Sequence, residues 1–410
     1  GKLSWQRLVM PSVQLARKGI IVTDGLAKSL KRAMPRLERH PASKAQFTND
    51  GKLLEAGDLW RQKDLSKTLR RIANKGPDGF YKGQTAALIV KEMEANGGLI
   101  TLDDLANYQA KKRKPLIGSY KGYEIISMPP PSSGGTVLIE MLNILEGFDL
   151  AASGFGTTET LHNMTESMRR AYADRAKFIG DPDFNTDMPI DRLISKPYAA
   201  QLRKTINRNK ASRSDPSAII LPEESPETTH FTVVDKDRNA VSLTYTLEYG
   251  YGSGIVVTGG GFLLNHEMGD FNAGPGLTDS QGLIGTTANL AAPGKRMLSS
   301  MSPTIIAKDG ELFMTVGTPG GRTIINTVMQ VILNVIDHGM NAQSAVDAGR
   351  IHHQWLPDVL RYEQQMFSKD SLNGLKSMGH TLEQRTNQGS AEVIVFNREV
   401  GALEGGVDRR

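Results

Sequence analysis

A polar stretch near the middle of the chain divides it into two parts of different character. Residues 203–227 are polar and contain three prolines, which is typical of an exposed linker. Before this stretch the apolar residues recur mostly at helical spacing, and after it many of them alternate as in strands. The stretch ends at Thr228-Thr229-His230, where the first expected strand begins. We therefore expect a mixed fold whose chain is accessible just before Thr228.

Apolar spacing and turn residues predict the main elements on both sides of this stretch. We expect helices near residues 65–73, 86–93, 136–145, 157–178 and 322–337, with a helix N-cap at Thr101. We expect strands near residues 231–234, 240–247, 303–307 and 312–316.

Composition excludes several classes of protein. The 410 residues carry 49 Lys and Arg against 44 Asp and Glu, a net charge of +5, and the basic residues are spread along the chain. With aromatic residues at only 6%, we see no basic and aromatic stripe that would bind nucleic acid. Because cysteine is absent, thiol catalysis, disulfides and cysteine-bound metals are excluded. No apolar run reaches the ~20 residues of a membrane span.

A strand that begins with two threonines is common, because β-branched residues favour strands. The functional interpretation of Thr228 therefore depends on the other motifs. They are, in chain order, Pro129-Pro130-Pro131-Ser132-Ser133-Gly134-Gly135, Gly180-Asp181-Pro182-Asp183, Thr228-Thr229-His230, Thr244-Tyr245-Thr246-Leu247, Leu263-Leu264-Asn265, Leu298-Ser299-Ser300-Met301-Ser302-Pro303-Thr304, Thr318-Pro319-Gly320-Gly321 and His352-His353-Gln354-Trp355.

This ordered set resembles the γ-glutamyltranspeptidase family, and the resemblance covers essentially the whole chain. It implies an α+β fold, the four-layer αββα sandwich of the N-terminal-nucleophile (Ntn) hydrolases. The family's precursor cuts itself, and the resemblance places the cut between Glu227 and Thr228. Residues 1–227 would then be part of a large subunit, residues 228–410 would be the small subunit, and the two together would form one αββα domain.

Elementary chemistry explains why a cut before Thr228 is useful. A threonine hydroxyl is a poor nucleophile at its ordinary pKa. A free α-amine has a pKa of ~7.7–8.0 and can act as the neighbouring base. Such an amine on Thr228 exists only after the preceding peptide bond is broken.

The resemblance implies further catalytic residues. Thr246 matches the position whose hydroxyl hydrogen-bonds the nucleophile, although a strand threonine can also simply fill space. Gly320 and Gly321 match the pair whose N–H groups stabilise the oxyanion. Two glycines before a helix also occur in tight turns and phosphate-binding loops, but no Gly-Lys-Ser/Thr follows them here.

Substrate selection is expected to be electrostatic. By the resemblance, Glu248, Glu267 and Asp270 bind the α-ammonium of a γ-glutamyl group, and Ser299 and Ser300 bind its α-carboxylate. Some family members carry Asn in place of Glu248 and Gln in place of Glu267. Three acids in one pocket should raise one another's pKa until a cation binds. We therefore expect tight selection for the charged amine.

This sequence departs from the family pattern in two further ways, both at the edges of the expected site. The family's lid loop corresponds to residues 272–298, and Gln281 stands where some members have a gating tyrosine. Family precursors also carry an earlier N-terminal segment with an arginine that pairs with the substrate carboxylate. We expect that segment to be missing from these 410 residues.

The expected reaction is γ-glutamyl transfer from glutathione or similar compounds to water, amino acids or peptides. We expect no cofactor or metal; the adjacent His352 and His353 should face opposite ways and serve packing. The family's usual place is periplasmic or secreted. Two alternatives remain: an acylase for glutaryl side chains such as those of cephalosporins, and a non-catalytic binder or unprocessed fragment.

Overall fold

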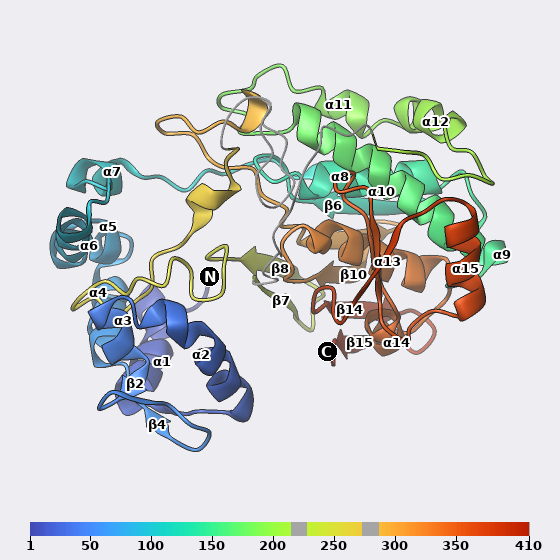
Figure 1. The fold of residues 1–410 in the computed structure, drawn as a ribbon. Coiled ribbons are helices and arrows are strands. Elements are labelled where there is room, and N and C mark those ends of the chain that lie inside the picture. The colour runs from blue at the N-terminus through green and yellow to red at the C-terminus, as the bar shows by residue number, and fades with distance from the viewer. Residues whose placement is uncertain (215–227, 273–286, 410) are drawn as a thin grey trace. The chain divides into compact units, whose positions relative to one another are not determined.

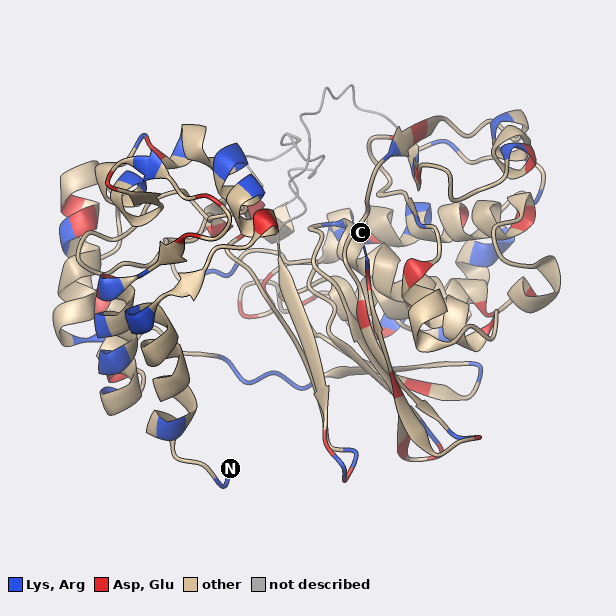
Figure 2. Ribbon diagram, turned by 90° about the horizontal axis from the view of Figure 1, so that it is seen from below, with Lys and Arg blue, Asp and Glu red and all other residues tan. Residues whose placement is uncertain are grey.

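The computed structural model describes residues 1–214, 228–272 and 287–409, and these form two compact units (Figure 1). The first unit comprises Gly1–Lys112 and Tyr249–His266, and the second comprises Arg113–Glu248 and Glu267–Arg410. Among the described residues, no helix combines the length and the apolar character that crossing a membrane requires. Figure 2 shows Lys and Arg on elements of both units, with Asp and Glu among them.

The first unit is mainly helical. A small core of Val22, Leu30, Leu37, Phe47 and Leu54 packs with Val256 from the later segment. Its elements are α1 (Trp5–Lys18), β1 (Ile20–Ile21), α2 (Asp24–Leu37), α3 (Pro41–Gln46), β2 (Thr48–Asn49), β3 (Lys52–Leu53), β4 (Leu59–Trp60), α4 (Lys63–Lys75), α5 (Asp78–Tyr81), α6 (Gly83–Asn96) and α7 (Leu102–Asn107).

The second unit is built on a six-stranded antiparallel sheet, with the order β15-β14-β10-β9-β6-β5. Its strands are β5 (Leu116–Tyr120), β6 (Tyr123–Ser127), β9 (Thr304–Lys308), β10 (Glu311–Gly317), β14 (Glu392–Asn397) and β15 (Ala402–Val407). The sheet thus joins strands from both sides of the central stretch, which places β5 and β6 beside the strands that follow Thr228.

The other elements of the second unit surround this sheet. They are α8 (Gly134–Leu145), α9 (Leu150–Ser153), α10 (Thr158–Phe178), α11 (Ile190–Leu193), α12 (Lys196–Lys204), β7 (Thr229–Val234), β8 (Ala240–Tyr245), η1 (Glu267–Asp270), η2 (Thr287–Asn289), α13 (Thr323–Ile336), α14 (Ala342–Asp347), β11 (Ile351–His352), β12 (Leu360–Glu363), α15 (Lys369–Ser377) and β13 (Leu382–Arg385).

Helices α8 and α13 pack against the six-stranded sheet, and α10 packs on α8 (Figure 1). Every residue of α8 is buried, and so is nearly all of α13, which explains why their sequences are apolar around the whole helix. Each fully buried Leu or Ile in this layer contributes about 1.5–3 kcal/mol relative to exposure. The layer therefore provides a rigid support for the residues that follow β10.

The antiparallel hairpin β7–β8 packs against the six-stranded sheet as a second sheet. The Thr232 hydroxyl lies 2.6 Å from the Thr315 hydroxyl of β10, and the Ser242 hydroxyl donates to the Val316 carbonyl at 3.3 Å. This contact places Thr228, which directly precedes β7, near the end of β10.

Most predicted elements are confirmed to within a few residues, including the capping box at Thr101. The expectation of an exposed linker over 203–227 is only partly confirmed in its described part, where residues 207–210 are exposed but others are not. Helix α12 extends to Lys204, and Ile206, Ala211 and Ser214 are buried. Strands β5 and β6 were not predicted. The division of the chain at residues 227 and 228 concerns cleavage, and it stays a prediction.

Candidate functional site

A small cavity of about 30 Å³ in the second unit collects most of the predicted site residues. It is lined by Thr228, Thr246, Glu248, Asp270, Ser299, Ser300 and Gly321, together with Arg175 and Arg322. Gly320 and Glu267 are not among its lining residues, although Glu267 lies in one group with Glu248 and Asp270. The structure thus brings the predicted residues into one neighbourhood, while their chemical roles stay predictions.

Thr228 lies at the beginning of the hairpin, opposite Thr246. Strand register pairs Thr229 with Tyr245, so the next position along the ladder brings the two threonines together. The Thr228 hydroxyl donates to the Thr246 hydroxyl at 3.5 Å, and Thr246 Oγ1 accepts the Glu248 N–H at 2.8 Å. Thr246 is therefore held by the backbone that follows it. Glu227 falls outside the described residues.

The acidic group comes from two segments. Glu248 follows β8 with a φ of 72°, a conformation that non-glycine residues seldom adopt, and Glu267 and Asp270 lie on the short helix η1. One carboxylate oxygen of each residue lies within 4.8 Å of the others. The Asn289 side chain donates to the Asp270 carbonyl at 2.7 Å and fixes η1 from outside the group.

Two of these acids, Glu248 and Glu267, have raised pKa values. Burial, the negative charge of Asp270 and a hydrogen bond with it raise the pKa of Glu248 to about 8, while Arg322 opposes that rise. Burial, followed by the charge of Asp270, raises the pKa of Glu267 to about 7. For Glu248 and Glu267 the neighbouring acids thus add to the effect of burial, in the direction expected from the sequence. A cation that enters the group would reverse the effect.

The two serines are held by the proline- and glycine-rich motif at 129–135. The Ser133 N–H and hydroxyl both donate to the Ser299 carbonyl, at 2.8 and 2.7 Å. A Cβ on Gly134 would lie 2.2 Å from the Met301 carbonyl oxygen, so only glycine permits this approach. The motif therefore sets the position of Ser299 and Ser300 beside the cavity.

The sequence analysis missed the arginine that lies next to these serines. Arg175 is buried on α10, where its Nε donates to the Ser133 hydroxyl at 2.8 Å and its Nη2 donates to the Ser300 hydroxyl at 3.0 Å. A guanidinium among hydroxyl groups provides the positive charge that a carboxylate requires. The available signal was a basic residue on the buried side of the helix predicted over 157–178.

Gly320 and Gly321 form the turn that leads into α13. Both have positive φ values, 136° and 55°, which favour glycine. The Thr323 N–H donates to the Gly320 carbonyl at 3.0 Å, so the turn is fixed by the first residues of the helix. Amides before a helix N-terminus favour negative charge, which suits the predicted oxyanion role.

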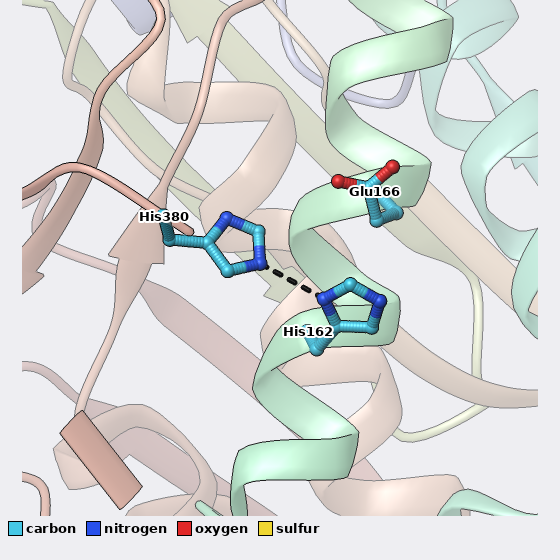
Figure 3. Close-up of side chains that lie close together, drawn as sticks. All are labelled: His162, Glu166 and His380. Atoms are coloured by element: carbon cyan, nitrogen blue, oxygen red, sulfur yellow. Dashed lines mark hydrogen bonds between the residues drawn. The ribbon is translucent and has the colours of Figure 1, made fainter. Parts of the chain in front are cut away.

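A second group of potential ligands lies apart from this cavity. His162 and Glu166 are one turn apart on α10, and His380 approaches them from the segment before β13 (Figure 3). The ring nitrogens His162 Nδ1 and His380 Nε2 are hydrogen-bonded at 2.8 Å, and His162 Nε2 lies 2.8 Å from the Asn207 carbonyl. Because that carbonyl can only accept, His162 Nε2 carries the proton and His380 Nε2 donates to His162 Nδ1.

Positive charge already compensates this second group. Glu166 accepts from Arg170 at 2.7 Å, from Arg169 at 3.3 Å and from the Ser212 N–H at 3.0 Å. Burial alone would raise the pKa of Glu166, but these partners lower it to about 2. A metal ion would have to displace the histidine pair and approach two guanidinium groups. The group is better suited to holding residues 207–214 against α10.

The adjacent histidines behave as expected of packing residues. The His352 ring lies 2.7 Å from the Asn326 amide and 2.8 Å from Gln354, while His353 contacts Asp358 at 3.1 Å. Burial lowers the pKa of His352 to about 3 and that of His353 to about 4. Both are therefore neutral at physiological pH. Gln281 and most of the predicted lid fall outside the described residues.

The first unit contains a larger cavity, of about 560 Å³, lined among others by Leu54, Trp60 and Val256. None of the predicted site residues lines it. Its size alone does not make it the functional site, because the convergent polar groups lie around Thr228.

Known proteins resemble this chain in sequence and in fold. The model of the γ-glutamyltranspeptidase family matches residues 1–410. The chain is 46% identical over 413 residues to the glutathione hydrolase proenzyme of Escherichia coli (strain K12), covering 100% of this chain and 71% of that protein. The crystal structure of cephalosporin acylase from Bacillus halodurans matches with a TM-score of 0.85 and 28% identity, covering 100% of this chain and 73% of that one.

A further similarity is to the γ-glutamyltranspeptidase of Helicobacter pylori, with a TM-score of 0.51 and 46% identity, covering 52% of this chain and 61% of that one. Together these similarities confirm the predicted α+β fold of the Ntn-hydrolase type.

Proposed function

The chain belongs to the γ-glutamyltranspeptidase family, and we propose that it is a γ-glutamyltranspeptidase and glutathione hydrolase. The observation that carries the proposal is the cavity in which Thr228 and Thr246 face the acidic group and the serine loop. This arrangement provides a nucleophile, a polar pocket and a loop of amides within one compact unit. It fits an acyl group that carries both a positive and a negative charge.

We propose that the chain cleaves itself between Glu227 and Thr228, so that Thr228 becomes an N-terminal nucleophile. Its new α-amine accepts the hydroxyl proton as Oγ attacks the γ-carbonyl carbon of the substrate. The Thr246 hydroxyl, 3.5 Å from Thr228 Oγ1, orients the nucleophile. The N–H groups of Gly320 and Gly321 stabilise the negative charge that develops on the carbonyl oxygen.

The second half of the reaction follows from the first. The α-ammonium of Thr228 returns its proton to the leaving amine, and a γ-glutamyl ester remains on Thr228. Water then hydrolyses the ester, or the amine of an amino acid or peptide takes the acyl group. No step in this sequence requires a metal or an organic cofactor.

The donor is recognised through its two charges. Glu248, Glu267 and Asp270 bind the α-ammonium, because their combined negative charge is relieved by a cation. Ser299 and Ser300 bind the α-carboxylate, and Arg175 adds a positive charge beside Ser300. Such a pocket penalises an acyl group that lacks the amine.

The direct test combines mass spectrometry with activity. Denaturing intact-mass measurement of the purified protein should give two chains, 1–227 and 228–410, and Thr228→Ala should remain uncut. The cleaved protein should release p-nitroaniline from γ-glutamyl-p-nitroanilide. A single uncut chain without activity would contradict the proposal and favour the non-catalytic alternative.

The similarity to a cephalosporin acylase keeps a second function open, namely hydrolysis of glutaryl amides. A glutaryl group has no amine and would bring no cation to the three acids. We therefore expect cleavage of the γ-glutamyl anilide to exceed that of the glutaryl anilide. The opposite preference would replace the proposed function by acylase activity.

We further propose that the two cleaved parts remain associated. The six-stranded sheet joins β5 and β6 from before the cut with β9, β10, β14 and β15 from after it, so separation would break this sheet. The names of the relatives as proenzymes support such processing. A periplasmic or secreted location is proposed from the family resemblance, and fractionation of cells would test it.

A further inference from the structure

One buried side chain, that of Asn289, connects the acidic group to the serine loop. Asn289 is 1% exposed, lies at the end of the short helix η2, and is not among the residues that line the cavity around Thr228. In the chain it stands between Asp270, a member of the acidic group, and Leu298, which directly precedes Ser299. Asn289 can therefore influence both halves of the proposed donor pocket from outside the cavity.

The side-chain amide of Asn289 makes one hydrogen bond to each half. Its Nδ2 donates to the Asp270 carbonyl at 2.7 Å, and its Oδ1 accepts the Leu298 N–H at 2.9 Å. These partners define the orientation of the amide, because a carbonyl can only accept and an N–H can only donate. Since the amide is a rigid plane, it fixes the separation of the two backbone segments that it joins.

On the acidic side, a second link strengthens the first. The Asn272 N–H donates to the Asn289 carbonyl at 3.0 Å, and Asn289 Nδ2 also lies 3.5 Å from Asn272 Oδ1. The short helix η1 ends at Asp270, so the chain that leaves it is bound at two nearby points. The positions of Glu267 and Asp270 are therefore tied to that of Asn289.

On the other side, the link continues into the serine loop. The Ser299 N–H donates to the Pro131 carbonyl at 3.1 Å, and the Ser299 carbonyl accepts from Ser133. The bond from the Leu298 N–H to Asn289 is buried, so removal of its acceptor would leave a donor unsatisfied. Asn289 thus holds the beginning of a loop whose next contacts come from the proline- and glycine-rich motif.

An α-amino acid makes a strict demand on the separation of the two halves. Its ammonium and its carboxylate are attached to the same carbon atom, so a pocket that binds both must keep their partners at a fixed distance. Displacements of about 0.5–1 Å are enough to weaken such a site strongly. A connection outside the cavity meets this demand without taking the place of the substrate.

We propose that Asn289 is a positioning residue that sets the separation between the acidic group and the serine loop. It acts on the substrate ammonium through Asp270 and on the substrate carboxylate through Ser299 and Ser300. The inference rests on the proposed function, since it needs a γ-glutamyl donor with both charges. None of the described hydrogen bonds of Asn289 is with Thr228 or the oxyanion glycines, so its loss should weaken donor binding more than the chemical step.

The experiment measures the kinetics of γ-glutamyl-p-nitroanilide cleavage, normalised to the fraction of cleaved chains. Asn289→Ala should raise KM about tenfold and change kcat by less than about threefold. Asn334→Ala is the matched control, because Asn334 is also a buried amide, donates to the Ala345 carbonyl at 3.0 Å and does not line the cavity. It should lower stability and leave KM within about twofold of that of the unchanged protein.

A double-mutant cycle separates positioning from a general loss. Asp270→Asn should raise KM in the unchanged background, and the same substitution in Asn289→Ala should raise it at least about threefold less, because the acid is no longer held against the ammonium. Effects that multiply in full would mean that Asn289 does not act through Asp270. Either that result or an unaltered KM in Asn289→Ala would refute the positioning role and leave the proposed function standing.

Asn289→Ser is the milder variant, which keeps a small polar group at this position. It should raise KM in the same direction and by less than Asn289→Ala. If neither variant gives folded and cleaved protein, Asn289 serves folding and the positioning role is refuted. If the unchanged protein releases no p-nitroaniline, the proposed function falls together with the inference.

Discussion

Two groups of three titratable residues in the second unit differ in their partners, and the first group is fully buried whereas the second is only partly buried. Glu166, with His162 and His380, is surrounded by guanidinium groups and a backbone N–H. Glu248, with Glu267 and Asp270, is surrounded mainly by its own like charges. The pKa of Glu166 falls to about 2, while those of Glu248 and Glu267 rise to about 8 and 7.

This difference shows that burial alone does not identify a binding site. Desolvation raises the pKa of all three glutamates, and only the partners decide the final direction. A compensated carboxylate stabilises the fold because its charge is satisfied in the native state. A group of carboxylates in which two pKa values stay raised reduces stability at neutral pH and gains from an added cation, which is what a substrate ammonium supplies.

The largest expected effect comes from breaking the compensated group. Glu166→Ala would leave Arg169 and Arg170 buried without their shared carboxylate, which should cost about 3–5 kcal/mol of unfolding free energy. Urea denaturation followed by circular dichroism measures this loss. Glu159→Ala on the exposed side of the same helix is the matched control and should change stability by less than about 0.5 kcal/mol. Equal losses in both variants would refute the distinction.

The next effect concerns donor binding by the group of Glu248, Glu267 and Asp270. Asp270→Asn removes the acid that most influences both glutamates, so the substrate ammonium loses a charged partner. We expect KM for γ-glutamyl-p-nitroanilide to rise by about 10- to 100-fold, corresponding to about 1.5–3 kcal/mol. Asp237→Asn, in the exposed turn of the β7–β8 hairpin, removes the same charge and should leave KM unchanged. An unaltered KM in Asp270→Asn would exclude this residue from ammonium binding.

The two groups also differ in how far the sequence could predict them. The motifs that contain Thr228, Ser299 and Gly320 are contiguous strings, so resemblance to a family placed them without a structure. Arg175 was missed because only the approach of α10 to the serine loop reveals its contact with Ser300. Its place in the sequence is that of an ordinary basic residue near a helix C-terminus.

The group of His162, Glu166 and His380 could not be predicted either, because only tertiary contacts bring its members together. His162 and His380 are 218 positions apart, and nothing in either local sequence indicates that they meet. The exposed linker was predicted only in part, because the contacts of Ser212 and Ser214 with Glu166 and Asp358 are tertiary. Local patterns predicted helices α4, α6, α8, α10 and α13 and the hairpins β7–β8 and β9–β10, but they missed other helices such as α1, α2 and α15. Strands β5 and β6 acquire their place in the sheet from partners distant in sequence.

The third prediction uses pH to separate the groups. At pH 6 the empty acidic group holds protons on Glu248 and Glu267, which must leave before the ammonium binds, and above about pH 8 it holds few. KM for the donor should therefore fall by at least about tenfold as pH rises from 6 to 8. In Glu248→Gln the KM should fall less over this pH range, and the fall should be centred near pH 7, where Glu267 loses its proton. A KM that does not change with pH in the unchanged protein would contradict the proton exchange.

The smallest expected effect is a gain in stability from the same substitution. A glutamate whose pKa is raised on folding stabilises the native state below its unfolded pKa, near 4.5, and this contribution is lost as pH rises through about 8. Glu248→Gln should therefore increase the unfolding free energy at pH 8.5 by about 1 kcal/mol, because partial exposure screens the charge, and give no gain at pH 4.5. Glu166→Gln is the contrasting variant. The Glu166 carboxylate is already satisfied by arginines, so its removal should destabilise the protein at pH 8.5. Urea titrations at both pH values measure the four differences. A loss of stability at pH 8.5 in Glu248→Gln would mean that its charge is compensated after all and would remove the contrast between the two groups.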